Sequence, residues 1–319
     1  MRVLITGVTG FAGGHLADFL LARGEREILG ISRTGMWPSA LAHLQGRVDI
    51  RACDLCDTGA VEKLLREAAP ERIFHLAGFA HAGQSFRAAE AAWAGNLHAT
   101  RALYDAVLRW GGRPRIIYVG SGLIYGDAKL SPGGFSEETT LRPVSPYAAS
   151  KAAADLASYQ YMRSAGLDIV RARPFNHTGP RQSPDYAVPN FARQIAAIER
   201  RLQPPVLETG NLSARRDLSD VRDVVAAYWS LGEQGRGGQA YNVASGVAHA
   251  MQTILDGLLR RTSARIQVRP GTNPPRATDT ALVQGNAQRL RDETDWKPRY
   301  TLDQTLDDTL AYWRRALSE

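Results

Sequence analysis

The chain has 319 residues and a mass of 34.8 kDa, which suits one large domain or two medium ones. Apolar residues make up 44% and charged residues 22%, an ordinary globular composition that argues against a disordered chain, a collagen or a coiled coil. The 39 basic and 32 acidic residues leave a net charge of +7 without basic blocks, which suits an anionic small molecule better than a nucleic acid.

The apolar runs of the chain are all short. The first one, directly after Met1-Arg2, covers too few residues for the core of a secretory signal. No run approaches the roughly 18 apolar residues that a membrane helix needs. We therefore expect a cytoplasmic protein without a membrane partner.

The first half of the chain alternates between apolar, β-branched runs and helical stretches. The predicted strands are residues 3–5, 27–31, 48–51, 72–76, 115–119 and 168–171, and the predicted helices are residues 14–22, 58–68, 91–110 and 146–164. Strands that alternate with helices imply right-handed crossovers and a parallel sheet. We predict an α/β fold, a doubly wound Rossmann sheet over residues 1–173, with residues 217–245 packing back on it.

The rhythm changes after about residue 174. Loops rich in proline and glycine appear at residues 178–184, 203–205 and 270–275, and the predicted helices are residues 188–201, 220–231, 250–261 and 302–316. This pattern predicts a smaller, irregular α/β substrate-binding lobe made of residues 174–216 and 246–319. The lobe and the sheet are expected to meet in a cleft, where ligands commonly bind.

A glycine-rich turn joins the first predicted strand to the first helix. Its sequence is Gly7-Val8-Thr9-Gly10-Phe11-Ala12-Gly13, a G-x-x-G-x-x-G variant of the dinucleotide fingerprint. Gly7 permits the tight turn, Gly10 lets main-chain N–H groups approach a pyrophosphate, and Gly13 allows close helix–strand packing. We expect Gly7, Gly10, Phe11, Ala12 and Gly13 to bind a dinucleotide.

The residues after the second and third predicted strands bear on the choice of cofactor. Ser32 and Arg33 stand where a site selective for NAD usually has an acidic residue. An arginine pairs with a 2′-phosphate, so we predict a preference for NADP(H), with NAD(H) as the alternative. Asp54 follows the third strand and is expected either to accept from the adenine amino group or to serve as a turn or helix-capping residue.

A tyrosine and a lysine four residues apart form the predicted catalytic pair. Tyr147 and Lys151 lie one turn apart on one helix face, and the chain has only four lysines. A phenol is a poor acid–base group near neutrality, but a nearby ammonium and a cationic nicotinamide lower its pKa. Ser121 ends a predicted strand upstream and is expected to donate to the same carbonyl oxygen; its alternative is a turn residue.

Two cysteines form a lone Cys-x-x-Cys. A structural zinc site needs about four ligands, and no second Cys/His pair lies at ligand spacing from Cys53 and Cys56. We expect no metal, and interpret both residues as small apolar side chains at the end of a strand.

These motifs together resemble the extended short-chain dehydrogenases/reductases that act on nucleotide-diphosphate sugars, over essentially the whole chain. The matching residues are Thr6–Gly13, Asp54-Leu55, His75-Leu76-Ala77-Gly78, Asn96, Ser121 with Tyr125-Gly126, and the Tyr147/Lys151 pair. The resemblance implies a Ser–Tyr–Lys triad over a nicotinamide and a supporting role for Asn96. It also implies that Leu55, Leu76, Ala77, Gly78 and Arg173 lie at the cofactor. Gly78 replaces the more usual alanine.

Three further segments resemble the GDP-4-dehydro-6-deoxy-D-mannose reductase subfamily. They are residues 173–180, 188–195 and 216–224. The resemblance implies a GDP-sugar substrate, with Asn176 at the sugar or first phosphate, Val188 and Arg193 near the guanine, and Arg216 and Arg276 on the diphosphate. The alternative for each arginine is a solvated surface group.

The reaction is narrowed by what is missing. The resemblance implies that 4,6-dehydratases carry an acidic residue after the triad hydroxyl, where this chain has Gly122 and Leu123, and that epimerase–reductases use a cysteine, which is lacking after Cys56. We expect reduction of a C4 ketone; the alternatives are an NDP-hexose 4-epimerase with tightly held NAD and a non-catalytic NADP-binding sensor. His177 is open as an acid–base group or, preferred, a structural one. The family implies a homodimer through the helix of residues 91–110 and that of Tyr147.

Overall fold

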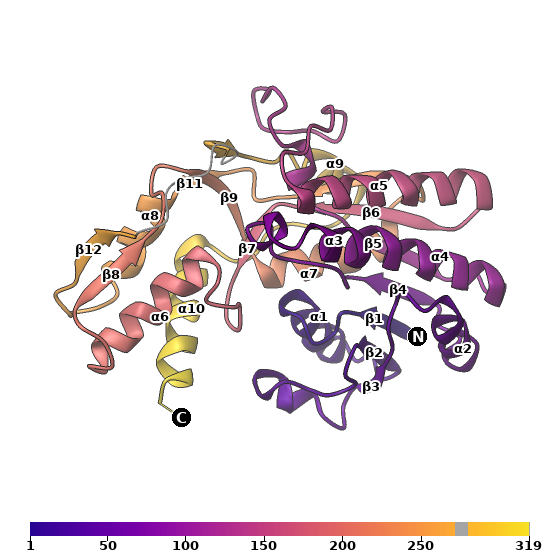
Figure 1. Ribbon diagram of the computed structural model, residues 1–319, viewed down its shortest axis with the longest axis horizontal. Coiled ribbons are helices and arrows are strands. Elements are labelled where there is room, and N and C mark those ends of the chain that lie inside the picture. Colours follow the sequence, from indigo (N-terminus) through magenta and orange to yellow (C-terminus); the bar gives the residue numbers. More distant parts are fainter. Residues whose placement is uncertain (272–279, 319) are drawn as a thin grey trace.

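A parallel sheet with helices on both faces forms the larger of two lobes (Figure 1). In this computed structural model the chain is described over residues 1–271 and 280–318. Seven strands lie in the order β10-β6-β5-β4-β1-β2-β3, with all neighbours parallel. Their bounds are Val3–Thr6 (β1), Ile28–Ser32 (β2), Asp49–Ala52 (β3), Arg72–His75 (β4), Arg115–Val119 (β5), Ile169–Pro174 (β6) and Ala240–Val243 (β10). The predicted Rossmann fold is confirmed.

Helices cover both faces of this sheet because its strands, apart from the exposed edge strand β3, carry apolar residues on both sides. Along β1, Val3 and Ile5 pack into the core on one face and Leu4 into the core on the other. Helices α1 (Phe11–Ala22) and α7 (Val221–Gln234) cover the first face; α2 (Thr58–Ala68), α4 (Ala99–Trp110) and α5 (Pro146–Ala165) cover the second.

The structure departs from the expected elements in two places. All six predicted strands are present, but β10 was not predicted; it extends the sheet beyond β6, and α7 precedes it on the same segment. The predicted helix over residues 91–110 is broken into α3 (Ala89–Trp93), a π-helical turn (Ala94–His98) and α4. Gly95 weakens the helix there, and π turns are often found at functional sites.

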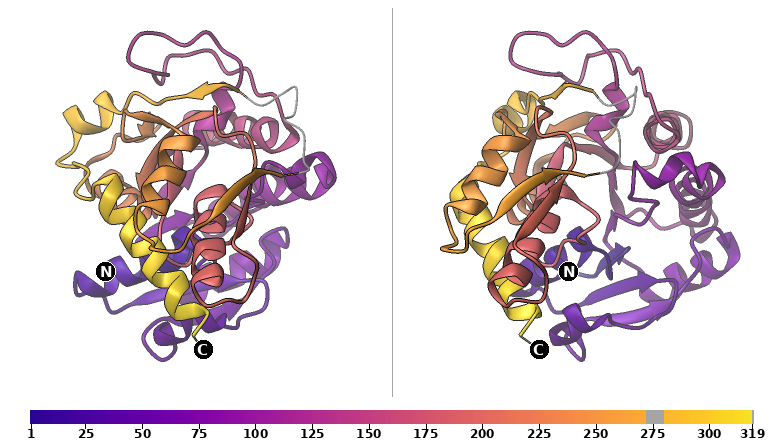
Figure 2. Two further views of the ribbon diagram at one scale, coloured as in Figure 1. Left: turned by 90° about the vertical axis from the view of Figure 1, so that its left-hand side faces the viewer. Right: turned by 60° about the vertical axis from the view of Figure 1, so that its left-hand side comes forward.

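A second lobe packs around its own core. Its main helices are α6 (Ala187–Glu199), α8 (Met251–Leu259) and α10 (Leu302–Ala316), and Figure 2 shows α10 (yellow) lying alongside α6. Its short strands are β7 (Asn176–Thr178), β9 (Arg215–Asp220), β11 (Ala248–Ala250) and β13 (Leu282–Val283), with a separate pair β8 (Val206–Thr209) and β12 (Gln267–Pro270). Helix α9 (Gln288–Glu293) lies next to β10. No helix in the described ranges combines the length and apolar character needed to span a membrane.

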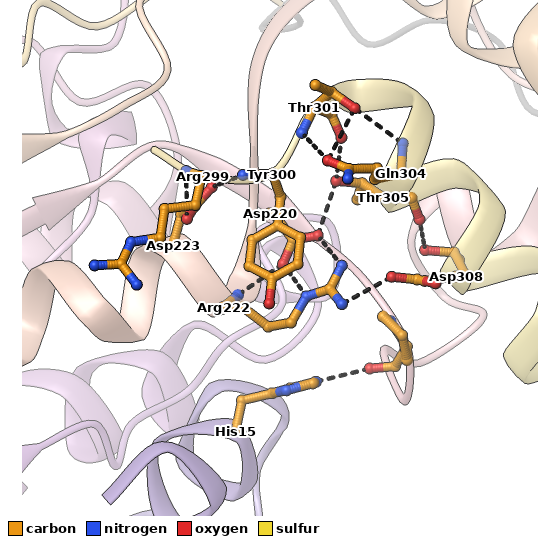
Figure 3. A network of polar contacts seen from close by, with 12 residues as sticks. His15, Asp220, Arg222, Asp223, Arg299, Tyr300, Thr301, Gln304, Thr305 and Asp308 are labelled. Carbon is orange, nitrogen blue, oxygen red and sulfur yellow. Dashed lines mark hydrogen bonds and ion pairs between the residues drawn. The ribbon is translucent and has the colours of Figure 1, made fainter. Parts of the chain in front are cut away.

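Charged residues around the start of α7 join the two lobes (Figure 3). Asp220 caps α7 by accepting from the Arg222 N–H, and also accepts from the hydroxyl of Thr305 on α10. Arg222 pairs with both Asp220 and Asp308 of α10, each at 2.7 Å. Asp223 accepts from two main-chain N–H groups just before α10. This network holds α10 against the N-terminal end of α7.

Candidate active site

The glycine turn after β1 has the shape that a dinucleotide pyrophosphate requires. Gly7 has φ of 72°, and a Cβ there would lie 2.8 Å from the main chain of Ala77. A Cβ at Gly13 would lie 2.2 Å from the Gly7 oxygen, so both positions exclude a side chain. Among the described residues no side chain caps the first turn of α1, which leaves its N–H groups, from Phe11 onward, for an anion.

At the end of β2 the two predicted residues have different surroundings. The Ser32 hydroxyl is buried and accepts from the Gly35 N–H at 2.9 Å, so it serves the turn. Arg33 is exposed and makes no ion pair or hydrogen bond with any residue of the described chain. Its guanidinium therefore remains available for a phosphate.

Asp54 and Leu55 lie after β3. The Asp54 carboxylate accepts from the Cys56 N–H at 2.9 Å, which is the predicted turn role, and Asp57 is the residue that caps α2. The Leu55 side chain is buried in the core under α2 and α4. Cys53 and Cys56 are free thiols, and burial raises the pKa of both. They are therefore weak nucleophiles.

Helix α5 places Tyr147 beside Ser121. Ser145 caps the helix and Pro146 begins it, so Tyr147 lies in the first turn. Ser121 follows β5 and its oxygen accepts from the Leu123 N–H at 3.1 Å, which leaves its own hydrogen for Tyr147 or a ligand. Burial raises the pKa of Tyr147, and the hydrogen bond with Ser121 opposes this more weakly. The phenol is thus protonated at neutral pH and suited to donate.

This direction holds for the protein alone, where burial and the Ser121 hydroxyl shift the pKa of Tyr147, and the lowering expected from a bound cationic nicotinamide stays a prediction. Within the protein, the effect of burial is larger than that of the Ser121 hydroxyl, so the pKa of Tyr147 lies above its ordinary value of 10. A cationic nicotinamide would act in the opposite sense, but it is not a group of the protein. The structure thus favours an acid over a base at Tyr147.

Lys151 lies one turn further along α5 and is almost fully buried. Its Nζ donates to the Val119 carbonyl at 2.9 Å and lies 5.7 Å from the centre of the Tyr118 ring. No carboxylate of the described chain pairs with it. Burial therefore lowers the pKa of Lys151 to about 8.

Replacing this buried ammonium is expected to stabilise the fold. Lys151→Met should raise the free energy of unfolding at pH 7 by up to about 3 kcal/mol, because the pKa falls from 10.5 in the unfolded chain to about 8 in the folded one. The unfolded chain holds the proton more tightly, so the cost is full below pH 8 and disappears as the pH rises to 10.5. Urea unfolding at pH 7 and pH 10 measures this.

The exposed Lys63 on α2 offers a matched control. Lys63→Met should leave the free energy of unfolding nearly the same relative to wild type at both pH values. A stability gain in Lys151→Met that is equal at pH 7 and pH 10 would contradict the buried-charge account.

Asn96 supports α5 from the π turn. Its Nδ2 donates to the Ser150 hydroxyl at 2.9 Å, and its buried Oδ1 has no partner in the described chain. A Cβ at Gly78 would lie 2.5 Å from this Oδ1 and 3.3 Å from Lys151 Nζ. Glycine in place of the usual alanine therefore matters more here than the sequence indicates, because alanine would have to displace Asn96.

Asp155 extends the stripe of Tyr147 and Lys151 by one more turn, and the sequence analysis missed it. Its fully buried carboxylate accepts from Arg171 at 2.6 Å and from Arg173 at 2.8 and 3.0 Å. Burial acts to raise the pKa of Asp155, but the two arginines hold it below its ordinary value. The i, i+4, i+8 spacing from Tyr147 is the sequence signal that identifies it.

This network corrects the expectation for Arg173. Its guanidinium is committed to Asp155, the Tyr125 hydroxyl and the Glu137 carbonyl, and only 4% of the residue is exposed. The side chain has a structural role and does not present its charge to a cofactor.

A pocket of about 200 Å³ opens beside the triad. Asn176 and Arg216, both predicted to bind substrate, line it together with Gly122, Leu123 and Ser145. The Oδ1 of Asn176 is buried and has no hydrogen-bond partner among the described residues, so it is available to accept a hydrogen bond from a ligand. Asp217, next to Arg216, is buried and anchors β9 by accepting from Ser245, Gly246 and Gly285.

Val188 and Arg193 lie outside this pocket, and their expected place near the guanine stays a prediction. Val188 is buried in the core of the second lobe, and Arg193 follows on the same helix, with its Nε buried and lacking a partner in the described chain. Neither lines the pocket beside the triad. Arg276 lies outside the described residues.

His177 has the structural role that was preferred for it. Its Nδ1 donates to the Phe175 carbonyl at 3.0 Å, and its ring stacks on Phe11, with centroids 5.9 Å apart and an angle of 6°. Burial lowers the pKa of His177. The ring thus packs the second lobe against the start of α1.

Comparison with known proteins agrees with this geometry. The family model described as GDP-mannose 4,6 dehydratase matches residues 4–309. GDP-6-deoxy-D-mannose reductase from Pseudomonas aeruginosa is 31% identical over 100% of this chain and 99% of its own.

Solved structures give the same picture. That of RMD from Pseudomonas aeruginosa complexed with NADPH has a TM-score of 0.86 at 29% identity, covering 99% of this chain and 100% of that one. That of Thermus thermophilus UDP-glucose 4-epimerase with NAD has a TM-score of 0.87 at 29% identity, with the same coverage. The chain therefore belongs to the GDP-mannose 4,6-dehydratase family of extended short-chain dehydrogenases/reductases.

Proposed function

We propose that this enzyme reduces the C4 ketone of GDP-4-dehydro-6-deoxy-D-mannose with NADPH in the cytoplasm, giving GDP-D-rhamnose or its C4 epimer GDP-6-deoxy-D-talose. The observation that carries the proposal is the placement of Tyr147 at the start of α5 near Ser121, beside a pocket whose described lining residues include no second acid or base. The similarity to a GDP-6-deoxy-D-mannose reductase and to an NADPH complex supports the substrate and cofactor. Two unpaired cysteines suit a reducing compartment.

NADPH would supply a hydride to the ketone carbon. The hydroxyls of Ser121 and Tyr147 lie near each other and would both bind the ketone oxygen, to which Tyr147 would give its proton. Lys151, still largely protonated at pH 7, stabilises the phenolate that remains. Asn176 would accept from a sugar hydroxyl, and Arg216 would face the diphosphate.

The pocket does not suit a dehydratase. Loss of water at C5 and C6 needs an additional acid–base group next to the triad hydroxyl, where Gly122 and Leu123 stand. A Cβ at Gly122 would lie 2.8 Å from the Phe175 ring, so an acidic side chain does not fit there without displacing that ring. Leu123 lines the pocket and has no proton to transfer.

A panel of three reactions separates the candidate functions. The reductase should oxidise NADPH with the ketosugar, should not dehydrate GDP-mannose with NADP, and should not epimerise an NDP-hexose without added cofactor. Epimerisation by the purified protein alone would favour the NAD-dependent 4-epimerase. Tight NADP binding with no turnover of any of them would favour the non-catalytic sensor.

The preference for NADPH should depend on Arg33. Arg33→Ala is expected to raise KM for NADPH between about 10-fold and about 100-fold, because a charge-assisted contact with the 2′-phosphate is lost. The KM for NADH should change little, since NADH has no 2′-phosphate. Steady-state kinetics with both cofactors tests this, and a parallel rise of both KM values would contradict the assignment.

The expected homodimer would cover an exposed apolar surface on α4 and α5. Leu108, Leu156 and Tyr159 are 41%, 58% and 45% exposed, more than large apolar side chains usually are. Leu156→Arg should therefore convert a dimer into a monomer in sedimentation or light scattering. An unchanged dimer would exclude this surface as the interface.

A further inference from the structure

His75, at the end of β4, is one of the buried titratable groups that the mechanism does not use. The residue is 1% exposed, and both ring nitrogens have partners. Its Nδ1 lies 2.8 Å from the Thr6 hydroxyl on β1, and its Nε2 lies 2.9 Å from the Thr100 hydroxyl on α4. His75 therefore joins the strand before the glycine turn to the helix after Asn96.

The neighbouring bonds place a hydrogen on Nε2 and leave Nδ1 able to accept. The Ala77 N–H donates to Thr6 Oγ1 at 3.1 Å, so the Thr6 hydroxyl hydrogen is free to donate to Nδ1. The Thr100 hydroxyl donates to the Asn96 carbonyl, so its oxygen accepts from Nε2–H. The Thr100 end requires a hydrogen on Nε2, and the Thr6 hydroxyl suits an Nδ1 that accepts, as in the neutral Nε2–H tautomer. Burial, with Lys151 nearby, lowers the pKa of His75 to about 3, which agrees.

The chain of bonds continues to the catalytic helix. Asn96 Nδ2 donates to the Ser150 hydroxyl at 2.9 Å, and Ser150 donates to the carbonyl of Tyr147 at 2.9 Å. The other end of this series of hydrogen bonds is Ala77. The main chain of Ala77 packs against Gly7 of the glycine turn so closely that a Cβ at Gly7 would lie 2.8 Å from it. A series of hydrogen bonds thus connects the residue that packs against the glycine turn to the main chain of Tyr147.

We infer that His75 is a positioning residue, which as the Nε2–H tautomer sets the distance between Ala77, against which the glycine turn packs, and Tyr147. This inference rests on the proposed function. Histidine suits the position because a rigid ring separates one donor from one acceptor, whereas an amide carries both on one carbon. Neither His75 nor Thr100 touches the reacting atoms, so their effect on the reaction is transmitted through Asn96 and Ser150.

The test removes one hydrogen bond of this network, the one made by the Thr100 hydroxyl. Thr100→Val keeps the shape and removes the hydroxyl, and we expect kcat to fall between about 10-fold and about 100-fold, with a larger isotope effect when NADPH carries deuterium at C4. Thr100→Ser retains the hydroxyl and should restore at least half of the wild-type rate. A Thr100→Val rate within about twofold of wild type, or no rescue by serine, overturns the inference.

A buried threonine on α10 gives the matched control. Thr309 is fully buried and donates to the carbonyl four residues earlier, as Thr100 does, but far along the chain from the site. Thr309→Val should cost similar stability and leave both kcat and the isotope effect unchanged. If Thr309→Val slows the reaction as much as Thr100→Val, the effect is general destabilisation and the inference is wrong.

A second readout does not need the substrate. The nitrogen NMR spectrum of His75 should show hydrogen on Nε2 only, without titration between pH 5 and pH 8, which would support the chain; an Nδ1–H tautomer or a titration there overturns it. If the wild-type protein binds NADPH but reduces no ketosugar, the proposed function fails. The spectrum still shows whether His75 is the Nε2–H tautomer that the inference requires.

Discussion

Tyr147→Phe is expected to lower kcat about 10³-fold while leaving the Kd for NADPH nearly unchanged, because a positioned general acid contributes about 10²- to 10⁴-fold. The substitution removes one oxygen and leaves the buried ring in place at the start of α5. Ser121 remains to polarise the carbonyl, so some activity should survive. Stopped-flow NADPH oxidation and cofactor fluorescence measure the two quantities separately.

Tyr104 provides the control for this substitution. It is also fully buried, and its hydroxyl bonds to Ser158 on the same helix α5 at 2.7 Å. Tyr104→Phe should lose about 1 kcal/mol of stability and little activity. If Tyr147→Phe turned over at the rate of Tyr104→Phe, Tyr147 would not be the acid.

The dependence of the reduction rate on pH should also identify Tyr147 as the proton donor. Burial raises the pKa of Tyr147, so the proton that the reduction needs is retained through neutral pH. The rate of ketone reduction should therefore stay level from neutral pH and decline only in the alkaline range. A decline that begins below pH 7 would contradict a protonated phenol as the donor.

Asp155→Asn is expected to cost about 3–5 kcal/mol of stability, the largest loss that we predict for a single side chain. The substitution leaves two guanidinium groups beside a neutral amide, and the side chains of Arg171 and Arg173 are only 11% and 5% exposed. Denaturant unfolding at pH 7 measures the loss. The activity of the remaining folded enzyme should also fall, since Asp155 anchors the helix that carries Tyr147.

The sign of the pH dependence follows from the direction of the shift. The arginines hold the pKa of Asp155 below its ordinary 3.8, so the carboxylate stabilises the fold at all pH values above about 4 and loses this effect as the pH falls through its folded-state pKa. The difference between wild type and Asp155→Asn should therefore be full at pH 7 and shrink only in strong acid.

An exposed ion pair serves as the control. Glu199 and Arg314 contact at 2.6 Å with side chains 22% and 42% exposed, and such pairs contribute about 1 kcal/mol or less. Glu199→Gln should be nearly neutral in the same assay. Equal losses in Glu199→Gln and Asp155→Asn would show that burial of Asp155 does not matter.

Local signals made much of this structure predictable from the sequence. The apolar runs of β1, β2, β4, β5 and β6 predict strands because both faces of a parallel sheet are buried, whereas β3 at the edge is mostly exposed. The Gly7 turn depends on a single residue type at one position, and the Tyr147/Lys151 spacing follows from the helical repeat. Each of these needs only neighbouring residues to be recognised.

What the sequence did not show depends on contacts between distant segments. The role of Arg173 is set by Asp155 from another element, and the contacts of Asn96 include Ser150 on a different helix. The seventh strand, β10, is four residues long and is identified only by its pairing with β6. The closeness of Gly78 to Asn96 likewise appears only once β4 and α4 are packed together.

The central claim is that Tyr147 donates a proton to a sugar ketone while NADPH gives the hydride. The most direct measurement uses NADPH with deuterium at C4 of the nicotinamide and GDP-4-dehydro-6-deoxy-D-mannose, followed by mass and proton spectra of the sugar product. We predict one deuterium at C4 of the sugar and a signal reduced about 10³-fold in Tyr147→Phe. A sugar product without deuterium, or equal labelling by both proteins in the same time, would contradict the account.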